Sequence, residues 1–288
     1  MRGICLVFFS FSALSAYASA INVDLGTAGS FAVLAGSDVT NTGSTLIDGN
    51  LGVWPGTSIS GFPPGVVNPL YTTDDDNAAA MQAQSDLTTA YNFAAREACG
   101  TTLSGDLGGM TLTPGVYCYT SAEPSAGLTG ALTLNTLGNQ DAVFIFQIAS
   151  TLITATDSSI VFSAGDGQDD NVYWQVGSSA TLGTGTEFQG NILANTSITL
   201  DTGATITCGS ALASGGAVTL DSNTVNVDSS AGCVAPAGGG VPEPGARYSC
   251  LALGLLGLIV YWRRSWKQAE PPYHPIPPKQ VIHSREFR

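Results

Sequence analysis

The chain is poor in charge, and positive charge is almost missing from most of it. Only 11% of its 288 residues are Asp, Glu, Lys or Arg, against about 25% in an average soluble domain. Between Ile21 and Gly240 the single base, Arg96, stands against 19 Asp and Glu, which gives this segment a net charge of −18. Nucleic-acid binding needs Lys and Arg grouped against phosphates, so no nucleic-acid partner is expected.

The same segment also lacks histidine and lysine, because the two histidines are His274 and His283. This absence excludes histidine-based proton transfer, a Ser–His triad and a lysine Schiff base. A hydrophobic content of 44% is in turn too high for an acidic disordered chain. We therefore expect a folded protein that is not an enzyme and carries no cofactor.

The first 20 residues are typical of a secretory signal peptide. Arg2 supplies the positive start, residues 4–11 the apolar stretch, and Ala18-Ser19-Ala20 a small-residue cleavage site. The mature chain then begins near Ile21 and is exported.

The C-terminal end has a second set of targeting features. A linker over residues 235–247 contains Val241-Pro242-Glu243-Pro244, residues 248–267 join an apolar run to a basic cluster, and a Pro-rich tail occupies 268–288. This order resembles the PEP C-terminal sorting signal. The resemblance implies an exosortase-type processing enzyme as partner and a transient or retained membrane segment. It also implies a secreted or cell-surface location.

Four cysteines remain between these two ends, namely Cys99, Cys118, Cys208 and Cys233. An even number in an exported chain predicts two disulfides, for which three pairings are open. The pairing Cys99–Cys118 with Cys208–Cys233 closes the shortest loops. No C-x-x-C spacing occurs, so the four thiols are not expected to form a metal site.

One stretch, residues 74–98, predicts a long helix. Three aspartates open it, where carboxylates favour the positive end of the helix dipole. Gly100 follows as a stop signal. An apolar stripe at helical spacing predicts packing on a sheet; it comprises Ala80, Leu87, Tyr91, Ala94 and Ala98.

The rest of residues 21–234 repeats a short motif, Thr-Leu-x-Thr/Ser. It starts at Thr133, Thr151, Thr181, Thr199 and Thr219, in steps of 18, 30, 18 and 20 residues. Such spacing with Gly turns predicts a mainly β fold, a three-sided β-solenoid of stacked coils. The longest step indicates an insertion near residues 166–171. Strand alternation turns each Leu inward and each first Thr outward.

A further pattern begins at the second Thr of each unit, as in Thr184-Gly185-Thr186-Glu187 and Thr202-Gly203-Ala204-Thr205. It occurs near the N-terminus as Thr42-Gly43-Ser44-Thr45. Repeated once per coil, such residues would stack about 4.8 Å apart. A flat, weakly charged array of methyls and hydroxyls holds surface water in a spacing close to that of ice.

The chain resembles the microbial ice-binding protein family over residues 23–227. The resemblance rests on segments such as 25–36, Leu112-Thr113-Pro114-Gly115-Val116-Tyr117 and Phe188-Gln189-Gly190-Asn191. It implies an irregular, right-handed, three-sided β-solenoid with a flanking helix, and an ice crystal surface as the partner of a monomer. A Thr-Gly/Ala-x-Thr/Asn pattern then assigns ice contact to Thr42, Thr45, Thr136, Asn139, Thr154, Thr184, Thr202 and Thr205. Asp157 and Glu187 stand where that pattern expects Thr or Asn.

Three alternatives compete with this interpretation. Asp166, Asp169 and Asp170 could serve a carbohydrate-active enzyme, but the missing His and Lys argue against one. The same cluster could bind Ca²⁺, although its spacing does not match an EF-hand loop. A cell-surface or matrix adhesin, with the solenoid as a rigid spacer without ice affinity, fits the sorting signal and stays open.

Overall fold

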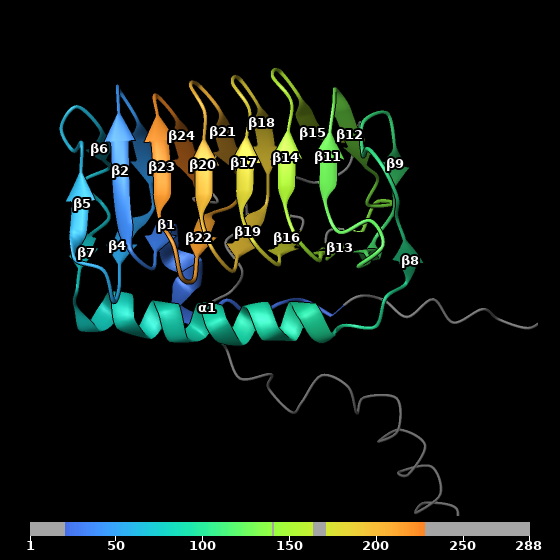
Figure 1. Cartoon of the computed structure of the whole chain (residues 1–288), viewed down its shortest axis with the longest axis horizontal. Helices are drawn as coiled ribbons and strands as arrows, with labels where there is room; N and C mark the ends of the chain where they lie inside the picture. Colours follow the sequence, from blue (N-terminus) through green and yellow to red (C-terminus); the bar gives the residue numbers. More distant parts are fainter. Residues whose placement is uncertain (1–20, 140, 164–170, 228–288) are drawn as a thin grey trace, which may run out of the picture. The chain divides into compact units, whose positions relative to one another are not determined.

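The computed structural model describes residues 21–139, 141–163 and 171–227, which form one three-sided β-solenoid with a helix alongside (Figure 1). The predicted signal peptide, the linker, the apolar segment, the tail, Cys233 and most of the expected insertion lie outside the described residues. Within the described residues, no helix is both long and apolar enough to cross a membrane.

Three parallel sheets make the three sides. Sheet A has the spatial order β7 (Thr73–Asp75), β4 (Asn50–Val53), β1 (Phe31–Ala35), β22 (Ala211–Ala213), β19 (Asn191–Ala194), β16 (Asn171–Val176), β13 (Val143–Ile148), β10 (Gly115–Tyr119), β8 (Thr101–Thr102). Sheet B has the order β11 (Ala126–Leu128), β14 (Leu152–Thr154), β17 (Ala180–Leu182), β20 (Ile198–Leu200), β23 (Val218–Asp221), β2 (Asp38–Thr42), β5 (Ser58–Ser60). Sheet C has the order β6 (Val66–Val67), β3 (Leu46–Asp48), β24 (Thr224–Asn226), β21 (Thr205–Thr207), β18 (Glu187–Gln189), β15 (Ser159–Phe162), β12 (Ala131–Leu134), β9 (Thr111–Leu112).

Each full coil runs through sheet A, then B, then C, but the coils do not stack in chain order. The N-terminal coil, residues 31–48, pairs through β1 with β22 of the last coil, residues 211–226. The second coil, residues 50–67, lies next to it at one end of the stack, where only β7 of sheet A lies beyond it. From there α1 (Ala78–Arg96) leads to the opposite end, where the chain resumes at β8 and builds coils back toward the first (Figure 1).

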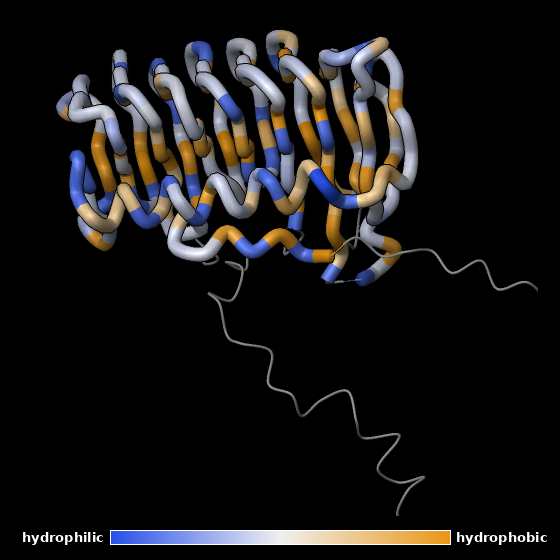
Figure 2. The backbone as a smooth tube through the Cα atoms, turned by 60° about the horizontal axis from the view of Figure 1, so that its bottom comes forward, coloured by the Kyte–Doolittle hydropathy of each residue, from blue (hydrophilic) through white to orange (hydrophobic). Residues whose placement is uncertain are grey.

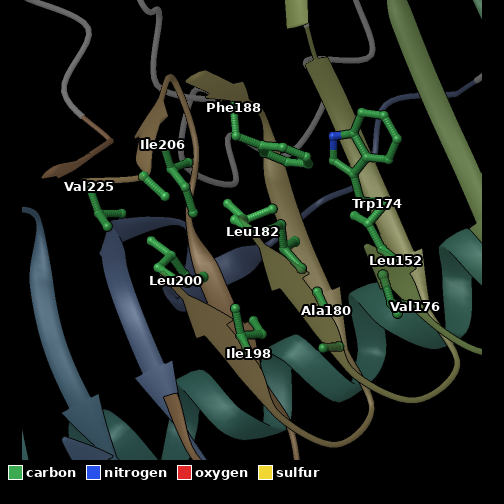
Figure 3. Close-up of a cluster of buried hydrophobic side chains, with 14 of the residues drawn as sticks. Leu152, Trp174, Val176, Ala180, Leu182, Phe188, Ile198, Leu200, Ile206 and Val225 are labelled. Carbon is green, nitrogen blue, oxygen red and sulfur yellow. The ribbon is translucent and has the colours of Figure 1, made fainter. Parts of the chain in front are cut away.

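The interior is a continuous apolar core, because alternate residues of every strand point inward. Hydrophobic stretches recur at matching places in successive coils (Figure 2). Side chains from all three sheets meet in the centre (Figure 3), among them Leu152, Trp174, Leu182, Phe188 and Ile206. The inward Leu of each repeat is buried as predicted; these are Leu134, Leu152, Leu182, Leu200 and Leu220.

A short aromatic stack extends through this core. Tyr117, Phe146 and Trp174 occupy the same register on β10, β13 and β16. Ring centroids lie 5.4 Å apart for the first pair and 3.9 Å apart for the second. Offset stacking of this kind adds about 1 kcal/mol per pair to burial.

The helix covers the outer surface of sheet A, but it is shorter than predicted. Asp74 and Asp75 pair as part of β7 with Gly52 and Val53, so they do not open the helix. Asn77 is the cap instead, and its side-chain oxygen accepts from the backbone N–H groups of residues 79 and 80. The C-terminal prediction was also too long, because Glu97 has already left the helical conformation, with ψ of 139°.

The stripe predicted on the helix is largely confirmed. Ala80, Leu87 and Ala94 are buried, whereas Tyr91 is half-buried and Ala98 is exposed beyond the helix. A short 3-10 turn, η1 (Gly26–Ser30), precedes β1 and packs against α1.

The predicted Cys99–Cys118 disulfide is confirmed and joins the segment after α1 to β10 of sheet A, with Cα atoms 6.0 Å apart. Cys208 is also disulfide-bonded, and its partner lies outside the described residues.

Candidate functional site

The outer surface of sheet B carries two parallel rows of small side chains, one residue of each row per coil. Register aligns the first row from β11 to β5; it contains Gly127, Ile153, Thr181, Thr199, Thr219, Thr40 and Ser60. The second row lies two residues before the first row in each coil. It contains Ser125, Thr151, Ser179, Ser197, Ala217, Asp38 and Ser58.

Parallel pairing positions these side chains. Strand alternation buries the neighbours of each outward residue, such as Ile198 and Leu200 around Thr199. Adjacent coils repeat about 4.8 Å apart. Hydroxyls of adjacent coils hydrogen-bond to one another at some positions; for example, Thr151 Oγ1 donates to Ser125 Oγ at 2.8 Å. The result is a regular array of hydroxyl and methyl groups on a stiff sheet.

Charge is nearly absent from this array. Asp38 is the one ionisable residue in the two rows; it lies on β2, between β23 and β5, and its carboxylate accepts from Ser37 Oγ at 2.8 Å. Ile153, 54% exposed, is the one large apolar side chain in the rows. Water over the rest of the array therefore meets neutral groups only.

The other two sides differ from sheet B. Sheet A is covered by α1, which contacts β1, β4, β7, β13, β16 and β19. Sheet C exposes a mixture of types, including Glu187, Leu46 and Val161. Two aligned rows of mostly small hydroxyl side chains are thus a property of sheet B.

The structure does not gather the eight predicted ice-contact residues on one face. Thr42 is the last residue of β2 on sheet B, whereas Thr184 and Thr202 follow their strands at the corner where each coil passes from sheet B to sheet C. Thr205 lies on sheet C, while Thr136 and Asn139 follow β12 at the corner between sheets C and A.

Three of the eight side chains are also sealed inside. Thr45 and Thr136 are each 1% exposed, and Thr154 is 3% exposed. Thr154 Oγ1 hydrogen-bonds to Thr186 Oγ1 at 2.7 Å and accepts from Gly183 N at 2.9 Å. Such hydroxyls satisfy backbone groups within the corner and do not reach a surface ligand.

The Thr-Gly pattern is a turn signature, which explains why several of these residues lie at corners. Gly185 and Gly203 have φ of 67° and 75°, a left-handed conformation that glycine adopts without steric cost. In the coil of residues 143–162 the corner residue is Asp157, with φ of 55°. Asp157 therefore serves the turn and Glu187 lies on sheet C, so neither interrupts the sheet B array.

The residues of the array were nonetheless marked in the sequence. The first Thr of the repeated motif was predicted to point outward, and Thr151, Thr181, Thr199 and Thr219 do so on sheet B. Thr133 instead lies on sheet C. The serines of the second row show no repeat signal in the sequence.

Ionisable groups with shifted pKa values lie away from the array. Burial raises the pKa of Tyr119 to about 12, with Asp106 and Glu123 adding to the rise. Burial also raises the pKa of Asp106, but hydrogen bonds from Thr129 and Gly108 outweigh it and leave that pKa below 3.8. In the part of the chain that the structure describes, no group of three His, Cys, Asp or Glu could hold a metal ion.

Comparisons with known proteins agree with this architecture. The family description "Ice-binding-like" matches residues 33–226, and that of the PEP-CTERM protein-sorting motif matches residues 240–265. The latter supports export to a secreted or cell-surface location.

An ice-binding protein of Nostoc sp. (strain HG1) is 51% identical over 268 residues, covering 92% of this chain and 96% of its own. The crystal structure of an ice-binding protein from an Antarctic biological consortium is similar with a TM-score of 0.68 and 46% identity, covering 77% of this chain and 96% of that chain. The crystal structure of an ice-binding protein from the Antarctic ascomycete Antarctomyces psychrotrophicus is similar with a TM-score of 0.66 and 44% identity. The match covers 72% of this chain and 99% of that chain. These relatives are ice-binding proteins rather than enzymes, and they give no support to a spacer without ice affinity. The chain belongs to the ice-binding protein family.

Proposed function

We propose that the protein binds ice through the outer surface of sheet B and so inhibits ice growth and recrystallisation. The observation that carries the proposal is the pair of aligned rows, in which Ser and Thr stand at ten of the fourteen positions. The ice-binding relatives described above support it.

The mechanism is adsorption and involves no bond making or breaking. Threonine methyls offer neighbouring water no hydrogen bond, so this water bonds to other water molecules. The hydroxyls hold water at the spacing between adjacent coils, about 4.8 Å. Water held in this pattern merges with an ice plane. Ice then bulges between bound molecules, and the curvature lowers the local freezing point.

Membership in the family and the lack of His and Lys between residues 21 and 240 support a role without catalysis. For export, we infer that an exosortase-type enzyme acts at the motif containing Val241-Pro242-Glu243-Pro244. A monomer fits a face that must stay open to meet ice.

The deciding experiment compares two variants within one coil. Thr199→Tyr places a bulky ring on the sheet B array, whereas Thr207→Tyr places the same ring on sheet C. We expect Thr199→Tyr to lose most of the thermal hysteresis, because the ring lifts the flat surface off the ice plane. Thr207→Tyr should keep it.

Both variants are checked for folding by circular dichroism, and ice crystal shape is recorded beside the hysteresis gap. Unfaceted crystals growing at the buffer rate in wild-type protein would refute the proposal. Equal losses of thermal hysteresis in the two folded variants would contradict an ice contact confined to sheet B.

A further inference from the structure

The sheet B array crosses one junction at which the two neighbouring coils are far apart in the chain. The coil of residues 31–48 lies on the coil of residues 211–226, with β1 on β22, β2 on β23 and β3 on β24. Between coils that are consecutive in the chain, the connecting segment limits how far the strands can slide. Across this junction the register must come from contacts between side chains and backbone.

The alternation of inward and outward residues does not fix this register by itself. A slip by one residue would turn the buried side chains outward, but a slip by two residues keeps the same faces inside. In the observed register Thr40 lies beside Thr219, and their Oγ1 atoms are 3.5 Å apart. A two-residue slip would place Thr219 beside Asp38 or Thr42 and would break the first row of the array.

Two buried residues meet across the junction at the corner between sheets B and C. Asn223 directly precedes β24 and Thr45 directly precedes β3, and each is 1% exposed. Asn223 N donates to Thr45 Oγ1 at 3.1 Å, and Leu46 N donates to Asn223 O at 2.9 Å. A slip would separate Thr45 Oγ1 from this N–H and leave both groups buried without a partner, which is costlier than losing an exposed hydrogen bond.

The side chain of Asn223 holds this corner in place. Its Oδ1 accepts from Asp221 N at 2.6 Å, and its Nδ2 donates to Asp201 O and to Ala204 O at 2.9 Å each. The last two carbonyls belong to the coil of residues 191–207. Asn223 therefore joins three neighbouring coils, and its own N–H is held in the direction of the N-terminal coil.

From these contacts we propose that Thr45 is a positioning residue for ice binding, because through Asn223 it fixes the register in which Thr219 and Thr40 continue one row. The inference rests on the proposed function of sheet B. The sequence pattern assigned Thr45 to direct ice contact, whereas its buried hydroxyl acts here without touching ice. A single buried Asn sets the register of coiled coils for the same physical reason.

Thr186 provides a matched control for Thr45. It directly precedes β18 at the same corner, is fully buried, and its Oγ1 hydrogen-bonds to Thr154 Oγ1 at 2.7 Å. That bond joins two coils that are consecutive in the chain, residues 143–162 and 171–189. Thr45→Val and Thr186→Val each replace one buried hydroxyl by a methyl group, so they differ in the junction that they affect.

Thermal hysteresis of the purified full chain is measured where circular dichroism shows every variant to be folded. We expect Thr45→Val to lose most of the hysteresis gap, and Thr45→Ser, which keeps the hydroxyl, to retain it. Thr186→Val should keep the wild-type gap even if its unfolding temperature falls. A wild-type gap in folded Thr45→Val, or equal losses in the two valine variants, would overturn the proposal.

The register itself is read by disulfide crosslinking, with and without Thr45→Val. Thr219→Cys is paired with Thr40→Cys for the observed register, and with Asp38→Cys or Thr42→Cys for the slipped ones. In the observed register these diagonal positions lie roughly 8 Å apart, too far for a disulfide. We expect a diagonal pair to crosslink once Thr45→Val is present. Crosslinking confined to the Thr40→Cys pair in both backgrounds would overturn the proposal.

A second pair of variants covers the case in which the valine variants do not fold. Ala204 occupies the corresponding corner position beside Asn223, so alanine fits there, and Thr45→Ala with Thr186→Ala repeats both measurements. Wild-type chain without hysteresis would overturn the proposed function, and the positioning role with it. Hysteresis that is lost in Thr199→Tyr but kept in both Thr45 variants would overturn this inference alone.

Discussion

Asp38 is the residue of the array whose chemistry is at odds with its neighbours. It lies in the second row between Ala217 and Ser58, on the strand β2 that pairs with β23 and β5. A carboxylate orients water around its own charge and disturbs an ice-like arrangement. Asp38 thus places the only charge within the two rows.

We expect Asp38→Asn to raise thermal hysteresis modestly, because the amide keeps the size of the side chain but removes the charge. Asp48→Asn is the matched control, since Asp48 points outward from sheet C and accepts from Asn68 Nδ2 at 2.7 Å. The hysteresis gap at fixed protein concentration is the measurement. An unchanged or smaller gap for Asp38→Asn would contradict this view of the array.

Asp106 stabilises one end of the stack, and its contribution depends on pH. Its Oδ1 accepts from Gly108 N at 2.7 Å, from Thr129 N at 3.1 Å and from Thr129 Oγ1 at 2.7 Å. These bonds favour the charged form and keep the folded-state pKa below the ordinary 3.8. The resulting stabilisation is full above the unfolded-state pKa and is lost as pH falls through the folded-state pKa.

Asp106→Asn should therefore cost about 1 kcal/mol of unfolding free energy at neutral pH, a small value because the carboxylate is exposed and its bonds are screened. In acid below the folded-state pKa the difference from wild type should vanish. Denaturant unfolding at both pH values measures it. A difference that persists in acid would show that the carboxylate charge is not the cause.

At the scale of elements, the corner turns show why sequence reasoning succeeded in part. The 18- to 20-residue spacing correctly predicted coils, buried leucines and outward threonines. The Thr-Gly pattern, however, recurs at the same period whether it forms a strand or a turn. Periodicity alone cannot tell these apart, so the eight residues chosen by this pattern lie at two corners and on sheets B and C, and some, such as Thr154, are buried.

The helix was misplaced at its start for a related reason. A run of aspartates is compatible with a helix N-terminus, but Asp74 and Asp75 can also extend sheet A beside β4. Pairing with Gly52 and Val53 is a non-local contact that residues near position 74 do not reveal. Tertiary pairing outweighed the local preference.

Gln147 fixes the far end of α1 to sheet A. Its Nε2 donates to Ala94 O at 2.7 Å and to Glu97 O at 2.8 Å, carbonyls that the helix terminus leaves without an intrahelical partner. Gln147→Leu should lower the unfolding free energy by about 1–3 kcal/mol, since the half-buried carbonyls lose their donor. The loss should leave ice binding intact, because sheet B lies on another side.

Gln82→Leu is the control for this change, as Gln82 lies on the exposed side of α1 and donates to Asp86 Oδ1. Gln82→Leu should lower the unfolding free energy only slightly, because the hydrogen bond that it removes is exposed to solvent. Thermal unfolding with hysteresis measured in parallel checks both variants. A loss of hysteresis in folded Gln147→Leu would mean that the helix shapes the ice face.

At the scale of the whole molecule, the stacking order could not be read from the sequence. A repeat predicts that each coil lies on the next one in the chain. Here β1 and β2 pair with β22 and β23, strands roughly 180 residues away, and this pairing makes Thr40 the rung after Thr219. The sheet B array is thus assembled from both ends of the described chain, with α1 as the long return connection.

This order predicts how a local defect spreads. Leu220 on β23 is buried between β20 and β2, so Leu220→Ala should cost about 3 kcal/mol through the cavity it leaves. Because solenoid coils are stabilised by their spatial neighbours, amide exchange should quicken in residues 198–200 and equally in residues 38–42. Hydrogen exchange read by mass spectrometry resolves both segments. Exchange that quickens only in residues 198–221 would mean that the N-terminal coil is stable without the last one. Faster exchange in residues 38–42 would show instead that the N-terminal coil and the last described coil hold one surface together.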